Sequence, residues 1–249
     1  MSRGAARVEG LPVRTADAAG HRLAYLEVGE GPAVLLVPGY TGSKEDFGPL
    51  LAPLAAAGHR VVALDQRGQL DSPGAGPADS YDPEGLATDL LALAAALDLR
   101  PAHVVGHSYG GIVARAALLR DPAAFASLTL LSSGPAAITG ARARLMRSLR
   151  GELATGGVAR VSSLLRAAGG HESFDALRFD ATDPVSLLGM GEALLSAPDR
   201  VPELSAALSD ASVPCLVACG DADDAWTPAV QQEMAERLGA RFALIPGAG

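Results

Sequence analysis

The sequence predicts an α/β protein with a mostly parallel central sheet flanked by helices. Short apolar runs of strand length recur along the chain, and longer segments with helical spacing lie between them. The chain has 249 residues, of which 49% are hydrophobic, and this is enough for one large core. Together these observations predict one main domain.

Six apolar runs are expected to form the sheet. Each is rich in valine or leucine and continuously apolar, as is typical of parallel strands that are buried on both faces. The runs are AVLLVP (33–38), RVVALD (60–65), HVVGHS (103–108), LTLLSS (128–133), CLVACGD (215–221) and FALIPG (242–247).

Four segments between these runs are expected to be helices. They have the helical spacing of apolar residues and cover 47–58, 83–99, 112–122 and 228–239. Because strands and helices alternate, the chain is expected to follow βαβ crossovers, which give parallel strands.

The alternation stops between Gly134 and about Pro202. Three consecutive segments there, ARARLMRSLR, VARVSSLLRAAGG and DPVSLLGMGEALLSAPDR, predict helices without intervening strands. We interpret this stretch as an inserted helical lid; a few ordinary surface helices are the alternative. The expected division is a first part of the core at 1–133, the lid at 134–202 and a second part of the core at 203–249.

The charge of the chain argues against two classes of partner. The formal net charge is −8 and the pI is near 5.1, so no basic surface is expected to bind nucleic acid or an anionic membrane. No apolar run of 18 residues and no hydrophobic signal region is present, and we expect a cytoplasmic protein. Cys215 and Cys219 lie in one expected strand and are interpreted as buried thiols, not as metal ligands.

One segment has the pattern of a nucleophile turn. VVGHSYGG (104–111) contains Gly106-x-Ser108-x-Gly110 between an expected strand and an expected helix. Ser108 would lie on a sharp turn above the carboxyl edge of the sheet, with the Tyr109 N–H at the helix N-terminus placed to stabilise an oxyanion. A small-residue turn that serves only close packing is the alternative. The strand and helix on either side favour the catalytic interpretation.

A second glycine-containing loop follows the strand at 33–38. Acyl transfer needs two converging N–H donors on the developing oxyanion, and the loop PGYTG offers the Tyr40 amide as the second donor. The alternative is a glycine-rich turn with no role in chemistry.

These motifs give the chain a resemblance to the α/β-hydrolase superfamily, specifically to its lidded esterase and peptidase-like members. The resemblance covers nearly the whole chain. Two residues depart from the family pattern, Pro38 in the oxyanion loop and Leu70 in the following turn, and they leave the subfamily open. The segments that carry it are PGYTGSKEDF (38–47), DQRGQLDS (65–72), GHSYGG (106–111), CGDADDAWTP (219–228) and FALIPGAG (242–249).

The resemblance implies a triad acid after a late strand. The family pattern of glycine, two residues and then the acid falls on Asp223, which would orient the catalytic histidine. Asp224 is the alternative acid, and Asp221 is interpreted as a turn residue. A merely solvated acidic loop is the non-catalytic interpretation.

The resemblance also places the general base after a turn like PGAG, with a closing helix behind it. The sequence ends there, at Gly249, and we expect a chain that is truncated before its catalytic histidine and its final helix. His107 neighbours Ser108, but its ring is expected to turn away from the hydroxyl, and His171 lies in the lid without a partner acid. The remaining histidines are expected to be structural: His21, His59 and His103.

The predicted function is hydrolysis of an ester, amide or thioester of a small molecule through an acyl-serine intermediate at Ser108. The native full-length form is expected to be an enzyme that needs no metal or organic cofactor, whereas this chain is expected to be impaired by loss of the base. An aspartate-type nucleophile, as epoxide cleavage requires, is absent from the turn.

The alternatives are a cofactor-free lyase of the same fold and a non-catalytic ligand-binding protein. The oligomeric state is left open. Apolar residues between the sheet edge and the lid are expected to bind the substrate, namely Leu187, Leu188, Met190 and Trp226.

Overall fold

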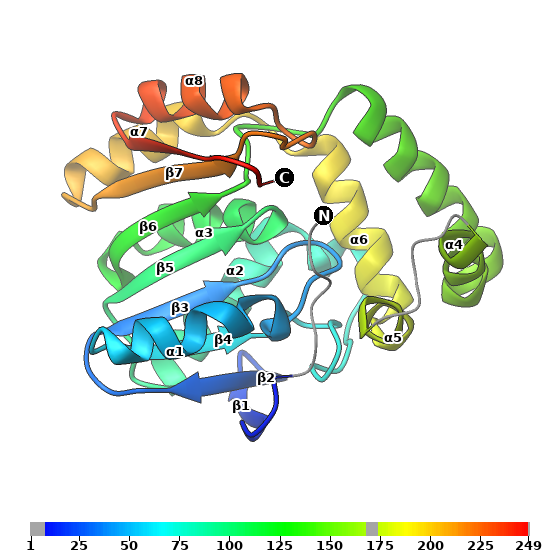
Figure 1. Cartoon of the computed structure of the whole chain (residues 1–249), viewed down its shortest axis with the longest axis horizontal. Helices are drawn as coiled ribbons and strands as arrows, with labels where there is room; N and C mark the ends of the chain where they lie inside the picture. The colour runs from blue at the N-terminus through cyan, green and yellow to red at the C-terminus, as the bar shows by residue number, and fades with distance from the viewer. Residues whose placement is uncertain (1–7, 168–173, 249) are drawn as a thin grey trace.

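The computed structural model describes residues 8–167 and 174–248, and an eight-stranded sheet lies at its centre (Figure 1). The strand order is β1-β2-β4-β3-β5-β6-β7-β8. β2 pairs antiparallel with β1 and β4, and all pairs from β4 to β8 are parallel, so the predicted mostly parallel sheet is confirmed. The bounds are β1 (Arg14–Ala18), β2 (His21–Val28), β3 (Ala33–Val37), β4 (Arg60–Leu64), β5 (Ala102–His107), β6 (Phe125–Leu131), β7 (Cys215–Gly220) and β8 (Arg241–Ile245).

Helices follow the expected order. The α-helices are α1 (Gly48–Ala56), α2 (Pro83–Ala96), α3 (Tyr109–Arg120), α4 (Gly140–Ala167), α5 (Phe174–Ala181), α6 (Pro184–Ser196), α7 (Val201–Asp210) and α8 (Pro228–Leu238). Short 3-10 turns are η1 (Lys44–Phe47), η2 (Ala78–Tyr81) and η3 (Pro122–Ala124). Within the described ranges, none of the helices combines the length and apolar character needed to span a membrane.

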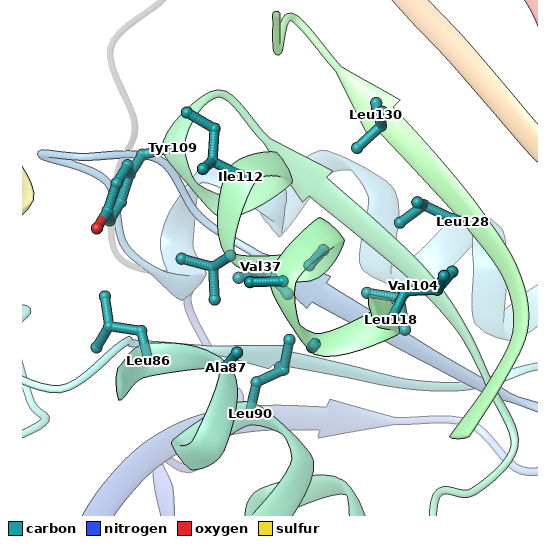
Figure 2. Packing of buried hydrophobic residues seen from close by; sticks show 14 of the residues in the cluster. Val37, Leu86, Ala87, Leu90, Val104, Tyr109, Ile112, Leu118, Leu128 and Leu130 are labelled. Atoms are coloured by element: carbon teal, nitrogen blue, oxygen red, sulfur yellow. The ribbon is translucent and has the colours of Figure 1, made fainter. Parts of the chain in front are cut away.

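The two faces of the sheet are covered by different helices because successive strand residues point to opposite faces. On β3, Leu35 and Val37 pack into the larger core cluster, to which α2, α3, α7 and α8 contribute. Figure 2 shows part of this cluster, with side chains of α2 and α3 against those of β5 and β6. Val34 and Leu36 instead pack with Leu51 of α1 in a second cluster on the opposite face.

The helices α4, α5 and α6 come between β6 and α7 and lie beyond the carboxyl ends of the central strands (Figure 1). α4 consists of two helical stretches joined at Gly157, whose φ of 68° interrupts it between two of the segments expected as separate helices. Leu153, Val161, Phe179 and Leu187 form a small apolar cluster among these helices. We call α4–α6 the lid helices; α7, which begins inside the expected lid range, packs instead with α3 and α8 on the face of the sheet.

Candidate active site

Ser108 lies on the turn between β5 and α3. Its φ is 52° and its ψ is −118°, a conformation in which a residue with a side chain is strained. The turn is tight: a Cβ added to Gly106 would lie 2.5 Å from the Gly110 carbonyl oxygen, and one added to Gly110 would lie 2.3 Å from the Val37 carbonyl oxygen. Both positions therefore need glycine. Ser108 does not cap α3, and its hydroxyl has no hydrogen-bond partner among the described residues, so it is available for chemistry.

The loop after β3 approaches this turn closely. A Cβ added to Gly39 would lie 3.2 Å from the Ser108 Cβ, so the loop backbone passes directly beside the serine. Within the described part of the chain, the amides of Tyr40 and Tyr109 donate to no protein acceptor. The Tyr109 amide is also the first of α3, where the helix dipole favours negative charge. The site thus has two open N–H groups from the segments expected to stabilise an oxyanion.

The three aspartates after β7 have different surroundings. Asp223 accepts hydrogen bonds from the Ala225 amide (3.1 Å) and the Trp226 amide (3.3 Å), and its second oxygen accepts one from Gln231 Nε2 (2.9 Å). These donors hold its carboxylate in one orientation. Asp221 accepts from the Gly247 amide (3.0 Å), which agrees with a turn role.

Asp224 is exposed, whereas Asp223 is half-buried. Its side chain is 73% exposed, and it forms an ion pair with Arg142 of α4 at 2.9 Å. A carboxylate in that position is screened by solvent and is engaged with the lid helices, so the geometry favours Asp223 over Asp224 as an orienting acid.

A cavity of about 500 Å³ lies above Ser108, between the loop at 39–42 and the lid helices. Apolar side chains of α4 form much of its wall, and Arg142 and Arg178 add positive charge. Trp226 lines the cavity as expected from the sequence, and its indole Nε1 donates to the Ala136 carbonyl at 2.9 Å. The apolar members of the lining are Ile138, Leu145, Met146, Leu149, Leu153, Val161, Phe179 and Leu194.

The other three residues expected to bind substrate do not line this cavity. Leu187 is fully buried in the cluster among the lid helices, and Met190 is fully buried in the main core. Leu188 borders a separate depression beside Glu192. The sequence places all three on α6 but does not show which face of the helix turns toward Ser108; Leu194 is the α6 residue that reaches the cavity.

His107 lies nearer to the site than the sequence suggested. It lines the same cavity as Ser108, and its Nδ1 would lie 3.3 Å from a Cβ added to Gly39, so its ring lies beside the loop after β3. That the ring turns away from the Ser108 hydroxyl stays a prediction. Burial lowers the pKa of His107, against opposing attraction from Asp46 and Asp223. A buried imidazole with a lowered pKa is neutral at neutral pH.

The other histidines are away from the nucleophile or outside the description. His103 Nδ1 lies 2.8 Å from Ser127 Oγ, and the ring of His59 packs edge-on against the ring of His103. His21 lies 3.9 Å from Asp89. His171 lies outside the described residues. The prediction that the catalytic histidine follows Gly249 stays a prediction.

The sequence did not predict the buried ion-pair cluster that lies under the loop at 38–42. The Lys44 ammonium lies 2.8 Å from Asp65 Oδ2 and 2.6 Å from Asp71 Oδ2. Burial raises the pKa of Asp65 to about 6, although attraction to Lys44 opposes this. The cluster ties η1, which follows the loop at 38–42, to the turn at 65–72. The one hint in the sequence is that Lys44 is the single lysine among 20 basic residues.

Three contacts tie the lid helices to the loops around Ser108. The Tyr40 hydroxyl donates to the Leu187 carbonyl at 2.9 Å, and burial raises its pKa. Arg178 of α5 pairs with Asp46 in η1. The third contact is the ion pair between α4 and the loop after β7. The lid helices are therefore held at both sides of the cavity mouth.

The tight turn at Ser108, the glycine-containing loop after β3 and the mostly parallel sheet are typical of the α/β-hydrolase class. The family described as alpha/beta hydrolase fold matches residues 32–165, more than half of the chain, so the chain belongs to this family.

Several relatives are hydrolases by name. The chain is 41% identical over 104 residues to a putative carbamate hydrolase RutD of Variovorax paradoxus, and 36% identical over 109 residues to the sn-1-specific diacylglycerol lipase ABHD11 of Mus musculus. These matches cover 42% and 43% of this chain, and only 39% and 34% of the relatives' own lengths.

Solved structures show the same fold over almost the whole chain. An enol-lactonase from Burkholderia xenovorans LB400 matches with a TM-score of 0.78 and 24% identity, covering 95% of this chain and 92% of the lactonase. A thermophilic esterase from Thermogutta terrifontis matches with a TM-score of 0.77 and 24% identity, covering 95% and 89%. At this identity the likeness concerns the fold.

Proposed function

We propose that the protein is a serine hydrolase that cleaves an ester, amide or thioester of a small molecule through an acyl-serine intermediate. The observation that carries the proposal is the Ser108 hydroxyl, which is held on a strained turn without a hydrogen-bond partner among the described residues and faces an apolar cavity beside two open amides. A purely structural turn has no need of an open hydroxyl at this edge of the sheet.

In the proposed reaction, Ser108 Oγ attacks the acyl carbon of the substrate while a general base takes its proton. The carbonyl oxygen becomes negative, and the Tyr40 and Tyr109 amides donate to it. Return of the electron pair to the carbonyl expels the alcohol, amine or thiol, which receives the proton. Water then cleaves the acyl-serine by the same route and restores the hydroxyl.

Asp223 is the proposed orienting acid because its carboxylate is fixed by two backbone amides and Gln231. In this proposal the base is a histidine that Asp223 orients. The Ala248 carbonyl accepts from the Ala222 amide at 2.9 Å, so the segment after β8 lies beside the loop that carries Asp223.

The lining of the cavity favours a small substrate with an apolar acyl group. Aliphatic and aromatic side chains from the lid helices surround the space above Ser108, and burial of such a group would supply most of its binding energy. Epoxide hydrolases are also among the relatives, but a serine at the nucleophile position disfavours that chemistry, which requires a carboxylate nucleophile.

Hydrolysis of p-nitrophenyl butyrate tests the proposal. Ser108→Ala should lower the rate at least tenfold, whereas Ser209→Ala, a matched change at an exposed serine of α7, should leave it unchanged. Intact-protein mass spectrometry should detect one butyryl group on the wild type and none on Ser108→Ala. Equal hydrolysis by wild type and Ser108→Ala, with no adduct, would contradict the proposal for this chain.

A further inference from the structure

We propose that Gln69 is a positioning residue for the oxyanion hole, a role that rests on the proposed function. Its side chain is fully buried in the turn after β4, and its Nε2 donates to the Gly39 carbonyl at 2.7 Å and to the Tyr40 carbonyl at 3.2 Å. It does not line the cavity, so it would act on the reaction only through the loop.

The effect follows from the planarity of the peptide group. In a trans peptide, the carbonyl of one residue and the N–H of the next point in opposite directions. By drawing the Gly39 oxygen toward the turn, Gln69 directs the Tyr40 N–H to the other side of that peptide. Gly39 passes directly beside Ser108, so this is the peptide whose N–H has to face a developing oxyanion.

Gln66 supports the same arrangement. Its Nε2 donates to the Pro38 carbonyl at 2.8 Å, so three successive carbonyl oxygens of the loop accept from two glutamine side chains of one turn. The Gln69 Oε1 in turn accepts from the backbone N–H of Gln66 at 3.0 Å, and this bond fixes the orientation of the Gln69 side-chain amide.

Hydrogen bonds within the turn itself hold these glutamine donors in place. The backbone N–H of Gln69 donates to the backbone carbonyl of Gln66 at 2.9 Å, and the backbone carbonyl of Gln69 accepts from the Ser72 N–H at 2.8 Å. Asp65, at the start of the turn, is held by the Lys44 ammonium and by the Lys44 amide. Donors fixed before the reaction stabilise charge without reorganisation during it.

One local bond competes with this explanation. The Gly42 amide also donates to the Gly39 carbonyl, at 3.1 Å, and closes a turn within the loop. That bond survives any change at Gln69, so the experiment asks whether it is sufficient to orient the peptide.

Two substitutions remove the donor in different ways. Gln69→Glu keeps the size of the side chain and an oxygen that can accept from the Gln66 amide, but when ionised it faces both carbonyl oxygens with an acceptor. Gln69→Leu removes the hydrogen bonds without introducing a charge. Gln232→Leu is the matched control, because among the described residues the Gln232 side-chain amide bonds only to Glu236, on the exposed side of α8.

The first measurement is steady-state hydrolysis of p-nitrophenyl butyrate below the lowest unfolding temperature of the set. We expect both Gln69 variants to lose kcat by on the order of 10²-fold, as for removal of one oxyanion donor, with KM within about twofold of wild type because ground-state binding is unchanged. A purely structural role would change the unfolding temperature and leave the kcat of folded protein unchanged.

The second measurement is a crystal structure of Gln69→Leu, which does not depend on turnover. We expect the Gly39–Tyr40 peptide to be rotated or to occupy two orientations. An unchanged peptide would overturn the inference, and so would a kcat within twofold of wild type. If the wild type has no Ser108-dependent turnover, the proposed function fails, and the peptide orientation still decides the role of Gln69.

Discussion

Gly110→Ala is expected to destabilise the protein and to disturb the oxyanion loop at the same time. The added Cβ would lie 2.3 Å from the Val37 carbonyl oxygen and 2.5 Å from the Pro38 carbonyl oxygen. Ordinary contact begins near 3.4 Å, so α3 and β3 have to separate by about 1 Å, and neither oxygen can rotate away because both belong to the backbone. Overpacking of this kind costs about 1–3 kcal/mol, from which a small gain in helix propensity is subtracted.

Thermal and urea unfolding measure this effect. A net loss of about 2 kcal/mol corresponds to a fall in Tm of about 4–8 °C for a chain of this size. Ser108-dependent hydrolysis should fall as well, because Pro38 lies two residues before Tyr40, the proposed oxyanion donor. Gly151→Ala is the control: it lies in α4 with no atom near the added Cβ, and it should stabilise by about 0.5–1 kcal/mol. Equal stability of Gly110→Ala and wild type would refute the argument from close approach.

Three further predictions concern the surrounding groups. Asp223→Asn should lower kcat by on the order of 10²–10⁴-fold, and Asp224→Asn by less than threefold; the reverse ranking would transfer the acid role to Asp224. The folded-state pKa of Asp65 is raised to about 6, so the stability that it contributes is fully present below its unfolded pKa and is lost as pH rises through 6. Urea unfolding should therefore show the stability of wild type relative to Asp65→Asn falling by about 2 kcal/mol from pH 4 to pH 7, and a constant difference would contradict the pKa. Tyr40→Phe should lower the free energy of unfolding by about 1–2 kcal/mol, because the Leu187 carbonyl loses its donor; an unchanged urea midpoint would show that the bond contributes nothing.

The strands β3 and β4 could be predicted from the sequence because nearly every residue of each is buried. A strand buried on both faces is apolar at every position, and β3 is an example. β1 was not among the expected strands because it is largely exposed and lacks a continuous apolar run. The helix α3 starts at Tyr109, earlier than the apolar spacing indicated, because the glycines after the nucleophile still have helical backbone.

The tight turn at Ser108 could be predicted because its requirements are local: two glycines, a serine, and a strand and helix on either side. The wall of the cavity could not, since it depends on how α6 is rotated against its neighbours. Leu187 and Met190 are both apolar, yet one packs among the lid helices and the other in the main core.

The roles of Gln66 and Gln69 were hidden for another reason. Their hydrogen bonds reach carbonyl groups about 30 residues away in the chain. A glutamine that binds a distant backbone has no spacing pattern that separates it from an exposed one, and only the folded chain brings the two loops together.

The burial of Lys44 also makes the protein suited to chemical footprinting. Its side chain is 0% exposed and engaged with carboxylates in the folded state, and it is the single lysine of the sequence. Acylating reagents that modify amines should therefore spare this position while the protein is native and modify it only when the region opens. The extent of acylation at Lys44, measured by peptide mass spectrometry, would show how often the region around this side chain opens, without any introduced label.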